Sequence, residues 1–150
     1  TDLQKPDYFD EMHTMDRLEE LLPRADVVAL SLPETPKTRQ VINRRTLDLM
    51  KDDAVLINVG RGSAVDTEAL CDTLESGRLL GAALDVTDPE PLPPEHRLWR
   101  IKNAFITPHS AGGTTLPETE ERLVRICAGN LEAYLNGRPL RNIVDRNAGY

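Results

Sequence analysis

The 150-residue sequence lacks the patterns that mark several large classes of protein. Its formal net charge is −7 and its lysines and arginines are scattered, so it has no basic stripe that could bind nucleic acid phosphates. No apolar run approaches the ~20 residues that a transmembrane helix needs. The first residues have no signal-peptide layout. We therefore expect neither a nucleic acid nor a membrane partner, and we expect a cytoplasmic location.

Cysteine is also scarce. The two cysteines, Cys71 and Cys127, stand among apolar neighbours within helical patterns and form no CxxC or Cys/His spacing. A zinc site would require such spacing, so we expect no metal. We interpret both cysteines as buried free thiols, because an unpaired cysteine usually behaves as a small apolar residue.

Four short runs that are nearly continuous in apolar residues predict the strands of a sheet. They cover residues 27–32, 54–59, 81–86 and 104–107. Continuous rather than alternating runs are typical of strands that are buried on both faces of a parallel sheet. Helical patterns lie between the runs, and this alternation requires crossover connections. The sequence therefore predicts an α/β fold that contains part of a doubly wound parallel sheet.

Capping residues indicate where the helices begin and end. Asn43 and Asp66 are placed to cap two helices, and Gly77 suits the end of the second. A longer helix is predicted over residues 116–135, where apolar residues recur at spacings of three, four and seven. Residues 89–99 contain four prolines and form an irregular loop, of a length that is usually functional.

Chemically useful side chains follow the predicted strands. Arg61 comes after the second run, and the glycines on either side of it would let the backbone approach a ligand closely. Asp85 lies in the third run with Glu90 in the loop behind it, and His109 follows the fourth. Each residue alone has an ordinary explanation as a loop residue, turn cap, exposed charge or structural histidine. Ligands bind at the carboxyl ends of parallel strands, so the shared position favours acid/base chemistry on an anionic substrate.

Three ordered motifs resemble those of the D-isomer-specific 2-hydroxyacid dehydrogenase family. They are LINVGRG at residues 56–62, ALDVTDPEP at residues 83–91 and TPHSAG at residues 107–112. Shorter segments at residues 25–28, 33–38 and 69–77 are similar to the family as well, so the resemblance extends from about residue 18 to residue 144. It implies that the predicted sheet belongs to a Rossmann-like NAD-binding domain.

The resemblance also implies roles for individual residues. The protein would interconvert a 2-oxo acid and a D-2-hydroxy acid by hydride transfer, with NAD, or alternatively NADP, as cofactor. Arg61 would bind the substrate carboxylate, His109 would be the general acid and base, and Glu90 would pair with His109 and favour its imidazolium form. Asp85 would face the carboxamide end of the nicotinamide. The other residues expected along the path of the cofactor, beside Arg61 and His109, are Leu32, Pro33, Val59, Gly60, Ser110, Ala111 and Gly112.

Three family features are missing from the 150 residues. No set of glycines has the GxGxxG spacing of the phosphate-binding turn, and no acidic residue is placed to bind the adenosine ribose. The separate substrate domain of the family is missing too. We therefore expect an incomplete domain: a partial nucleotide-binding domain over residues 1–115, then a long C-terminal helix and tail over residues 116–150 that cross back toward an absent substrate domain. Such a fragment is expected to be inactive alone, and its parent is expected to be a homodimer.

A second hypothesis comes from a different functional class. The same family includes transcriptional corepressors that keep this fold, sense nucleotides and bind partner proteins, and these can retain the arginine, glutamate and histidine. The acidic composition favours the enzyme. The sequence does not name the 2-hydroxy acid, and it does not separate NAD from NADP.

Overall fold

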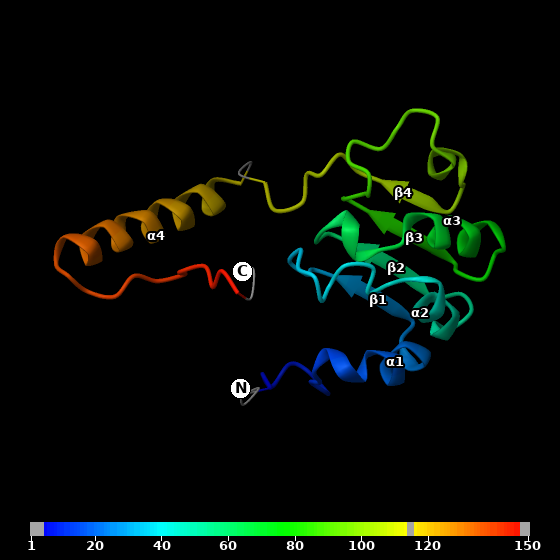
Figure 1. Ribbon diagram of the computed structural model, residues 1–150, viewed down its shortest axis with the longest axis horizontal. Coiled ribbons are helices and arrows are strands. Elements are labelled where there is room, and N and C mark those ends of the chain that lie inside the picture. Colours follow the sequence, from blue (N-terminus) through cyan, green and yellow to red (C-terminus); the bar gives the residue numbers. More distant parts are fainter. Residues whose placement is uncertain (1–4, 114–115, 148–150) are drawn as a thin grey trace.

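The computed structural model describes residues 5–113 and 116–147. Four strands form one sheet in the order β1-β2-β3-β4, and each neighbouring pair is parallel (Figure 1). The strands are β1 (Val27–Leu30), β2 (Val55–Asn58), β3 (Gly81–Leu84) and β4 (Ala104–Ile106). Each strand falls inside one of the four apolar runs and is shorter than the run. The predicted parallel α/β sheet is thus confirmed.

Two capped helices connect the first three strands. They are α2 (Arg44–Leu49) and α3 (Thr67–Glu75). The Asn43 side chain accepts hydrogen bonds from two backbone N–H groups at the start of α2, and Asp66 accepts one from the Ala69 N–H at 3.0 Å. Both predicted caps are therefore present, and they satisfy N–H groups that the first turn of a helix leaves unpaired.

The remaining helical segments are short, apart from the last one. A single-turn helix, α1 (Leu18–Leu21), precedes the sheet, and the long helix α4 (Pro117–Leu135) follows it. None of the helices in the described part of the chain is long and apolar enough to cross a membrane. Four 3₁₀ turns complete the fold, at Met15–Arg17, Leu22–Arg24, Gly62–Ala64 and Arg97–Arg100.

One face of the sheet carries the hydrophobic core. Leu56 of β2, Leu47 of α2 and Leu70 of α3 are fully buried in a single cluster. The strand order has no reversal, so both right-handed crossovers place their helices on the same side. On the other face, Val27 is 54% exposed and Phe105 is 74% exposed. The continuous apolar runs predicted strands covered on both faces, but among the described residues only one face is covered.

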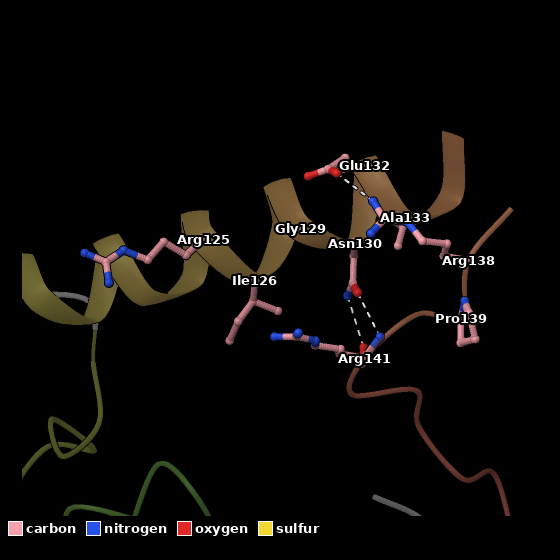
Figure 2. Close-up of a pocket in the computed structure, with 9 residues that line it drawn as sticks. All are labelled: Arg125, Ile126, Gly129, Asn130, Glu132, Ala133, Arg138, Pro139 and Arg141. Atoms are coloured by element: carbon pink, nitrogen blue, oxygen red, sulfur yellow. Dashed lines mark hydrogen bonds and ion pairs between the residues drawn. The ribbon is translucent and has the colours of Figure 1, made fainter. Parts of the chain in front are cut away.

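Helix α4 stands apart from the sheet, and the C-terminal tail runs back beside it (Figure 1). None of its described side chains is buried. The Asn130 side chain accepts a hydrogen bond from the Arg141 N–H at 2.8 Å and donates one to the Arg141 carbonyl at 3.0 Å, and Arg138 pairs with Glu132 (Figure 2). The predicted helix is confirmed, while the division into residues 1–115 and 116–150 stays a prediction.

The two cysteines have different surroundings. Cys71 on α3 is buried, as predicted, and burial raises the pKa of its thiol to about 11. A thiol that stays protonated at neutral pH is a poor nucleophile. Cys127 on α4 is exposed, so the interpretation of this residue as a buried thiol is wrong. The apolar stripe of α4 has no buried side chain among the described residues.

Candidate active site at the carboxyl edge of the sheet

The carboxyl ends of three parallel strands bring the predicted site residues to one edge of the sheet. Arg61 follows β2, Asp85 follows β3 directly, and His109 lies in the turn after β4. Because β2 pairs with β3 and β3 with β4 in parallel, the predicted shared edge is confirmed. A cavity of about 310 Å³ opens at this edge, and its walls include Asp85, Glu90 and His109.

His109 and Glu90 form a close pair. His109 Nδ1 lies 2.5 Å from Glu90 Oε1, and the two side chains are 44% and 41% exposed. The His109 backbone has a φ of 53°, in the left-handed region that residues with a Cβ seldom adopt. Holding such a backbone costs on the order of 1–3 kcal/mol, and strain of this kind concentrates at functional sites. The sequence-based expectation that these two residues meet therefore has direct geometric support.

Asp85 organises the turn that carries His109. Asp85 is 6% exposed, and its carboxylate accepts hydrogen bonds from the Thr107 hydroxyl, from the Ser110 N–H at 2.9 Å and from the Ala111 N–H at 2.8 Å. The hydrogen bond from Thr107, followed by those from Ser110 and Ala111, lowers the pKa of Asp85 to about 2. Asp85 is thus a permanent anion at neutral pH. The structure gives it a role in shaping residues 107–111, in addition to the cofactor contact that the resemblance implies.

Arg61 stands on the same edge but takes no part in the Glu90–His109 contact. Its side chain is exposed, and Nη1 donates a hydrogen bond to the Gly60 carbonyl at 2.8 Å. Most of its five N–H donors are available for an anion. The turn is held by Asn58, which is 1% exposed, donates to the Arg61 carbonyl at 2.9 Å and accepts from the Gly60 N–H at 3.1 Å.

The two glycines beside Arg61 have a structural explanation that the sequence did not reveal. A Cβ on Gly60 would lie 2.6 Å from the backbone nitrogen of Leu32, and a Cβ on Gly62 would lie 1.9 Å from the carbonyl oxygen of Thr87. Neither position can hold a side chain without a backbone shift. The glycines therefore let neighbouring chain segments meet, which is a different reason from the predicted approach of a ligand.

The residues expected along the path of the cofactor are divided between two places. Leu32 and Pro33, after β1, line a second cavity of about 520 Å³, together with residues 35–38, Met15 and Asn147. Val59 is 44% exposed after β2. The turn formed by Ser110, Ala111 and Gly112 lies beside His109 and is exposed. The structure places all of them after strand ends, but it does not join them into one cavity.

Two residues that the sequence analysis did not single out shape this site. Asn58 fixes the turn that carries Arg61, and the Thr107 hydroxyl donates a hydrogen bond to the Asp85 carboxylate. Each is a polar residue within or at the end of an apolar run, and this was the available signal. A buried polar side chain requires partners, so its presence in such a run indicates a local hydrogen-bond network.

The hydrogen-bonding capacity of the edge fits the nicotinamide end of a dinucleotide. Asp85 Oδ2 accepts one hydrogen bond, from Ala111, so it keeps capacity for a carboxamide N–H. Across residues 5–113 and 116–147, no group of three or more His, Cys, Asp or Glu side chains could hold a metal ion. The residues present therefore fit the cofactor at this end.

Comparison with known proteins gives a consistent family assignment. The sequence model described as the NAD binding domain of D-isomer specific 2-hydroxyacid dehydrogenases matches residues 2–111. The chain is 43% identical over 129 residues to a glyoxylate reductase of Aeropyrum pernix, which covers 86% of the chain and 38% of that protein. It is 41% identical over 121 residues to a hydroxyphenylpyruvate reductase of Plectranthus scutellarioides, which covers 81% of the chain and 38% of that protein.

A solved structure supports the same assignment. The D-isomer specific 2-hydroxyacid dehydrogenase of Xanthobacter autotrophicus Py2, in complex with NADPH and MES, superposes with a TM-score of 0.84 at 36% identity. The match covers 93% of the chain and 56% of that protein. The chain thus spans less than half the length of the two curated relatives named above. It belongs to the D-isomer-specific 2-hydroxyacid dehydrogenase family, and residues 2–111 correspond to the NAD-binding domain of that family.

Proposed function

We propose that the protein of which this chain is part reduces 2-oxo acids to D-2-hydroxy acids with a nicotinamide cofactor. The observation that carries this proposal is the His109–Glu90 pair, with 2.5 Å between Nδ1 and Oε1, at the carboxyl edge of a parallel sheet. A carboxylate that holds one imidazole nitrogen fixes the orientation of the ring and leaves the other nitrogen to face the substrate. This is the arrangement that a general acid requires.

The proposed chemistry assigns a step to each of three side chains. When bound, the cofactor supplies the hydride. His109 donates a proton from Nε2 to the carbonyl oxygen of the substrate, since Glu90 already occupies Nδ1. Arg61 binds the substrate carboxylate through the donors that Gly60 leaves available. The product gains one hydride at carbon and one proton at oxygen, and His109 is left as a neutral imidazole.

Asp85 supports this chemistry through the turn that it orders. Its hydrogen bonds to Ser110 and Ala111 fix the two residues that follow His109. Its remaining acceptor capacity suits the carboxamide of the cofactor, as the resemblance implies. Asp85 is therefore proposed to position both the histidine and the nicotinamide end.

The names of the relatives suggest which substrates to test. Glyoxylate, hydroxypyruvate and hydroxyphenylpyruvate are the 2-oxo acids in the names of similar enzymes. The Xanthobacter structure contains NADPH, so both NADH and NADPH belong in the assay. The cytoplasmic location and the homodimeric parent stay predictions from the sequence.

The decisive experiment replaces His109 in the full-length protein. We expect His109→Ala to reduce turnover of a 2-oxo acid about 100- to 10,000-fold, which is the usual contribution of a general acid. Cofactor affinity should change little, because the loss of one imidazole leaves the other cofactor contacts in place. Steady-state kinetics and a separate NADH titration measure the two effects.

The matched control is His13→Ala. His13 pairs with Glu11, on the segment before β1 and outside the carboxyl edge. This variant should keep the turnover of the unmodified protein. If His109→Ala also kept it, the assignment of the proton donor would be wrong, and the corepressor-like, partner-binding alternative would become the better hypothesis.

A further inference from the structure

The loop that carries Glu90 is attached to α3 at both of its ends. At its start, the Thr67 hydroxyl donates a hydrogen bond to the Asp88 carbonyl at 2.8 Å. At its end, Arg97 begins the 3₁₀ turn Arg97–Arg100, and its side chain donates a hydrogen bond to the Glu68 carbonyl of α3. Glu90 lies between these two attachments. The position of its carboxylate therefore depends on how residues 88–100 are held against the helix.

Arg97 makes an unusually dense set of contacts with α3. Its guanidinium pairs with three carboxylates, at 2.7 Å for Glu68, 2.7 Å for Asp72 and 3.1 Å for Glu75. It also donates to the Glu68 backbone carbonyl at 2.9 Å. Residues four and three apart share one face of a helix, so these carboxylates form a row of like charges. Arg97 is a cation that pairs with all three carboxylates and so offsets their repulsion.

The Arg97 side chain is partly buried where it meets α3. The side chain is 35% exposed, and its Nε is buried with no hydrogen-bond partner in the described part of the chain. An unpaired buried donor destabilises the folded state, so the contacts of the two terminal nitrogens must offset that loss. The hydrogen bond to Asp72 raises the pKa of Arg97, which therefore stays charged.

We propose that Arg97 is a positioning residue that holds Glu90 in contact with His109, by fixing the return of the 88–100 loop against the acidic face of α3. The inference rests on the proposed function, in which this pair supplies the proton. Leu92 and Leu98 are buried and pack the loop on the core, and the ion pairs of Arg97 add directional contacts between the loop and α3. A carboxylate–imidazole contact of 2.5 Å leaves little tolerance for displacement.

The pH dependence of the reaction separates this role from a simple charge effect. Among the described residues that line the cavity with His109, the charged side chains are two carboxylates, Glu90 on the loop and Asp85 after β3. If Glu90 moves away, the imidazolium loses a stabilising anion, and the pH profile of reduction shifts toward lower pH. If removal of a cation acted only through space, protonation of His109 would become easier and the profile would shift toward higher pH. The charged groups around Arg97 are the carboxylates of Glu68, Asp72 and Glu75. Two of them have a second partner: Glu68 also pairs with His96, and Asp72 also pairs with Arg44.

The test compares Arg97→Met with Arg44→Met in the full-length protein. Both changes remove a cation that pairs with Asp72, but Arg44 belongs to α2 and not to the loop. We expect Arg97→Met to shift the pH profile toward lower pH, in the same direction as Glu90→Gln, and Arg44→Met to leave it in place. Turnover of Arg97→Met at neutral pH should fall about 10- to 100-fold, since a misplacement of about 1 Å can have an effect of that size.

Two further measurements identify the route of the effect. In a Glu90→Gln background, Arg97→Met should cause no additional shift, because its action passes through Glu90. Amide hydrogen exchange over residues 88–96 should accelerate in Arg97→Met and not in Arg44→Met. If Arg97→Met does not fold, Arg97→Lys decides: it keeps the charge but not the forked geometry, so it should show the same shift at a smaller size.

The outcomes distinguish this inference from the proposed function. An unchanged pH profile in Arg97→Met, an equal shift in Arg44→Met or a shift toward higher pH would overturn the positioning role. Those results leave the effect of His109→Ala untouched. Retained turnover in His109→Ala would instead overturn the proposed function, whatever Arg97 does.

Discussion

At the scale of single residues, Asp85 links protonation to the geometry of the His109 turn. Hydrogen bonds lower its pKa from an ordinary value of 3.8 to about 2. A carboxylate with a depressed folded-state pKa contributes stability that is fully present above about pH 4 and is lost as the pH falls through about 2. We expect Asp85→Asn to lower the melting temperature at neutral pH. The deficit should shrink as the pH falls from 4 toward 2, which thermal unfolding across pH can measure.

Asp10→Asn is the control for this experiment. Asp10 is exposed on the segment before β1 and makes none of the contacts described for Asp85. The same loss of charge should therefore leave the melting temperature nearly unchanged at every pH. A deficit for Asp85→Asn that stayed constant down to pH 2 would show that shape, and not the carboxylate charge, holds the turn.

At the scale of elements, Gly62 controls how the turn after β2 meets the loop after β3. A Cβ at this position would lie 1.9 Å from the Thr87 carbonyl oxygen, and backbone atoms cannot rotate away as a side chain can. We expect Gly62→Ala to destabilise the protein by about 1–3 kcal/mol or more, as overpacking usually does. Since Arg61 precedes this turn, KM for the 2-oxo acid should rise as well. Chemical denaturation and steady-state kinetics measure the two effects.

The matched substitution is Gly129→Ala, in the interior of α4. A Cβ there meets nothing within 4 Å. Alanine is favoured over glycine inside a helix by up to about 1 kcal/mol, so this change should be neutral or stabilising and should leave KM unchanged. If the two variants behaved alike, the close approach at Gly62 would have no energetic consequence.

The elements also show which features of the structure could be predicted from the sequence. The four strands, the caps at Asn43 and Asp66 and the shared edge of the site were predictable, because apolar runs, capping side chains and crossover topology are local or nearly local patterns. The ion pairs of Arg97 and the hydrogen bond from Thr107 to Asp85 were not. They join residues that are far apart in sequence through irregular loops, whose paths follow from packing and carry no periodic signal.

At the scale of the whole molecule, two apolar surfaces remain open in the described part of the chain. One is the second face of the sheet, with Val27 and Phe105 exposed, and the other is the apolar stripe of α4, with Leu131 and Leu135 exposed. Large exposed apolar patches usually mark sites of interaction. In contrast, the core between the sheet, α2 and α3 is fully packed. The candidate catalytic residues therefore follow strands that are held by a buried hydrophobic core.

The last prediction concerns dinucleotide binding by the 150-residue chain when it is produced alone. A pyrophosphate is normally held by backbone N–H groups at a helix N-terminus behind a glycine-rich turn, and the sequence contains no GxGxxG spacing. Losing two or three charge-assisted hydrogen bonds weakens binding by about 4 kcal/mol, or ~1,000-fold. Titration of NADH, followed by its fluorescence, should therefore show no saturation at micromolar concentrations, while the full-length protein saturates in the same assay. Circular dichroism confirms that the chain is folded, and micromolar affinity of the folded chain alone would mean that the strand ends after β1, β2 and β4 are sufficient to bind the cofactor.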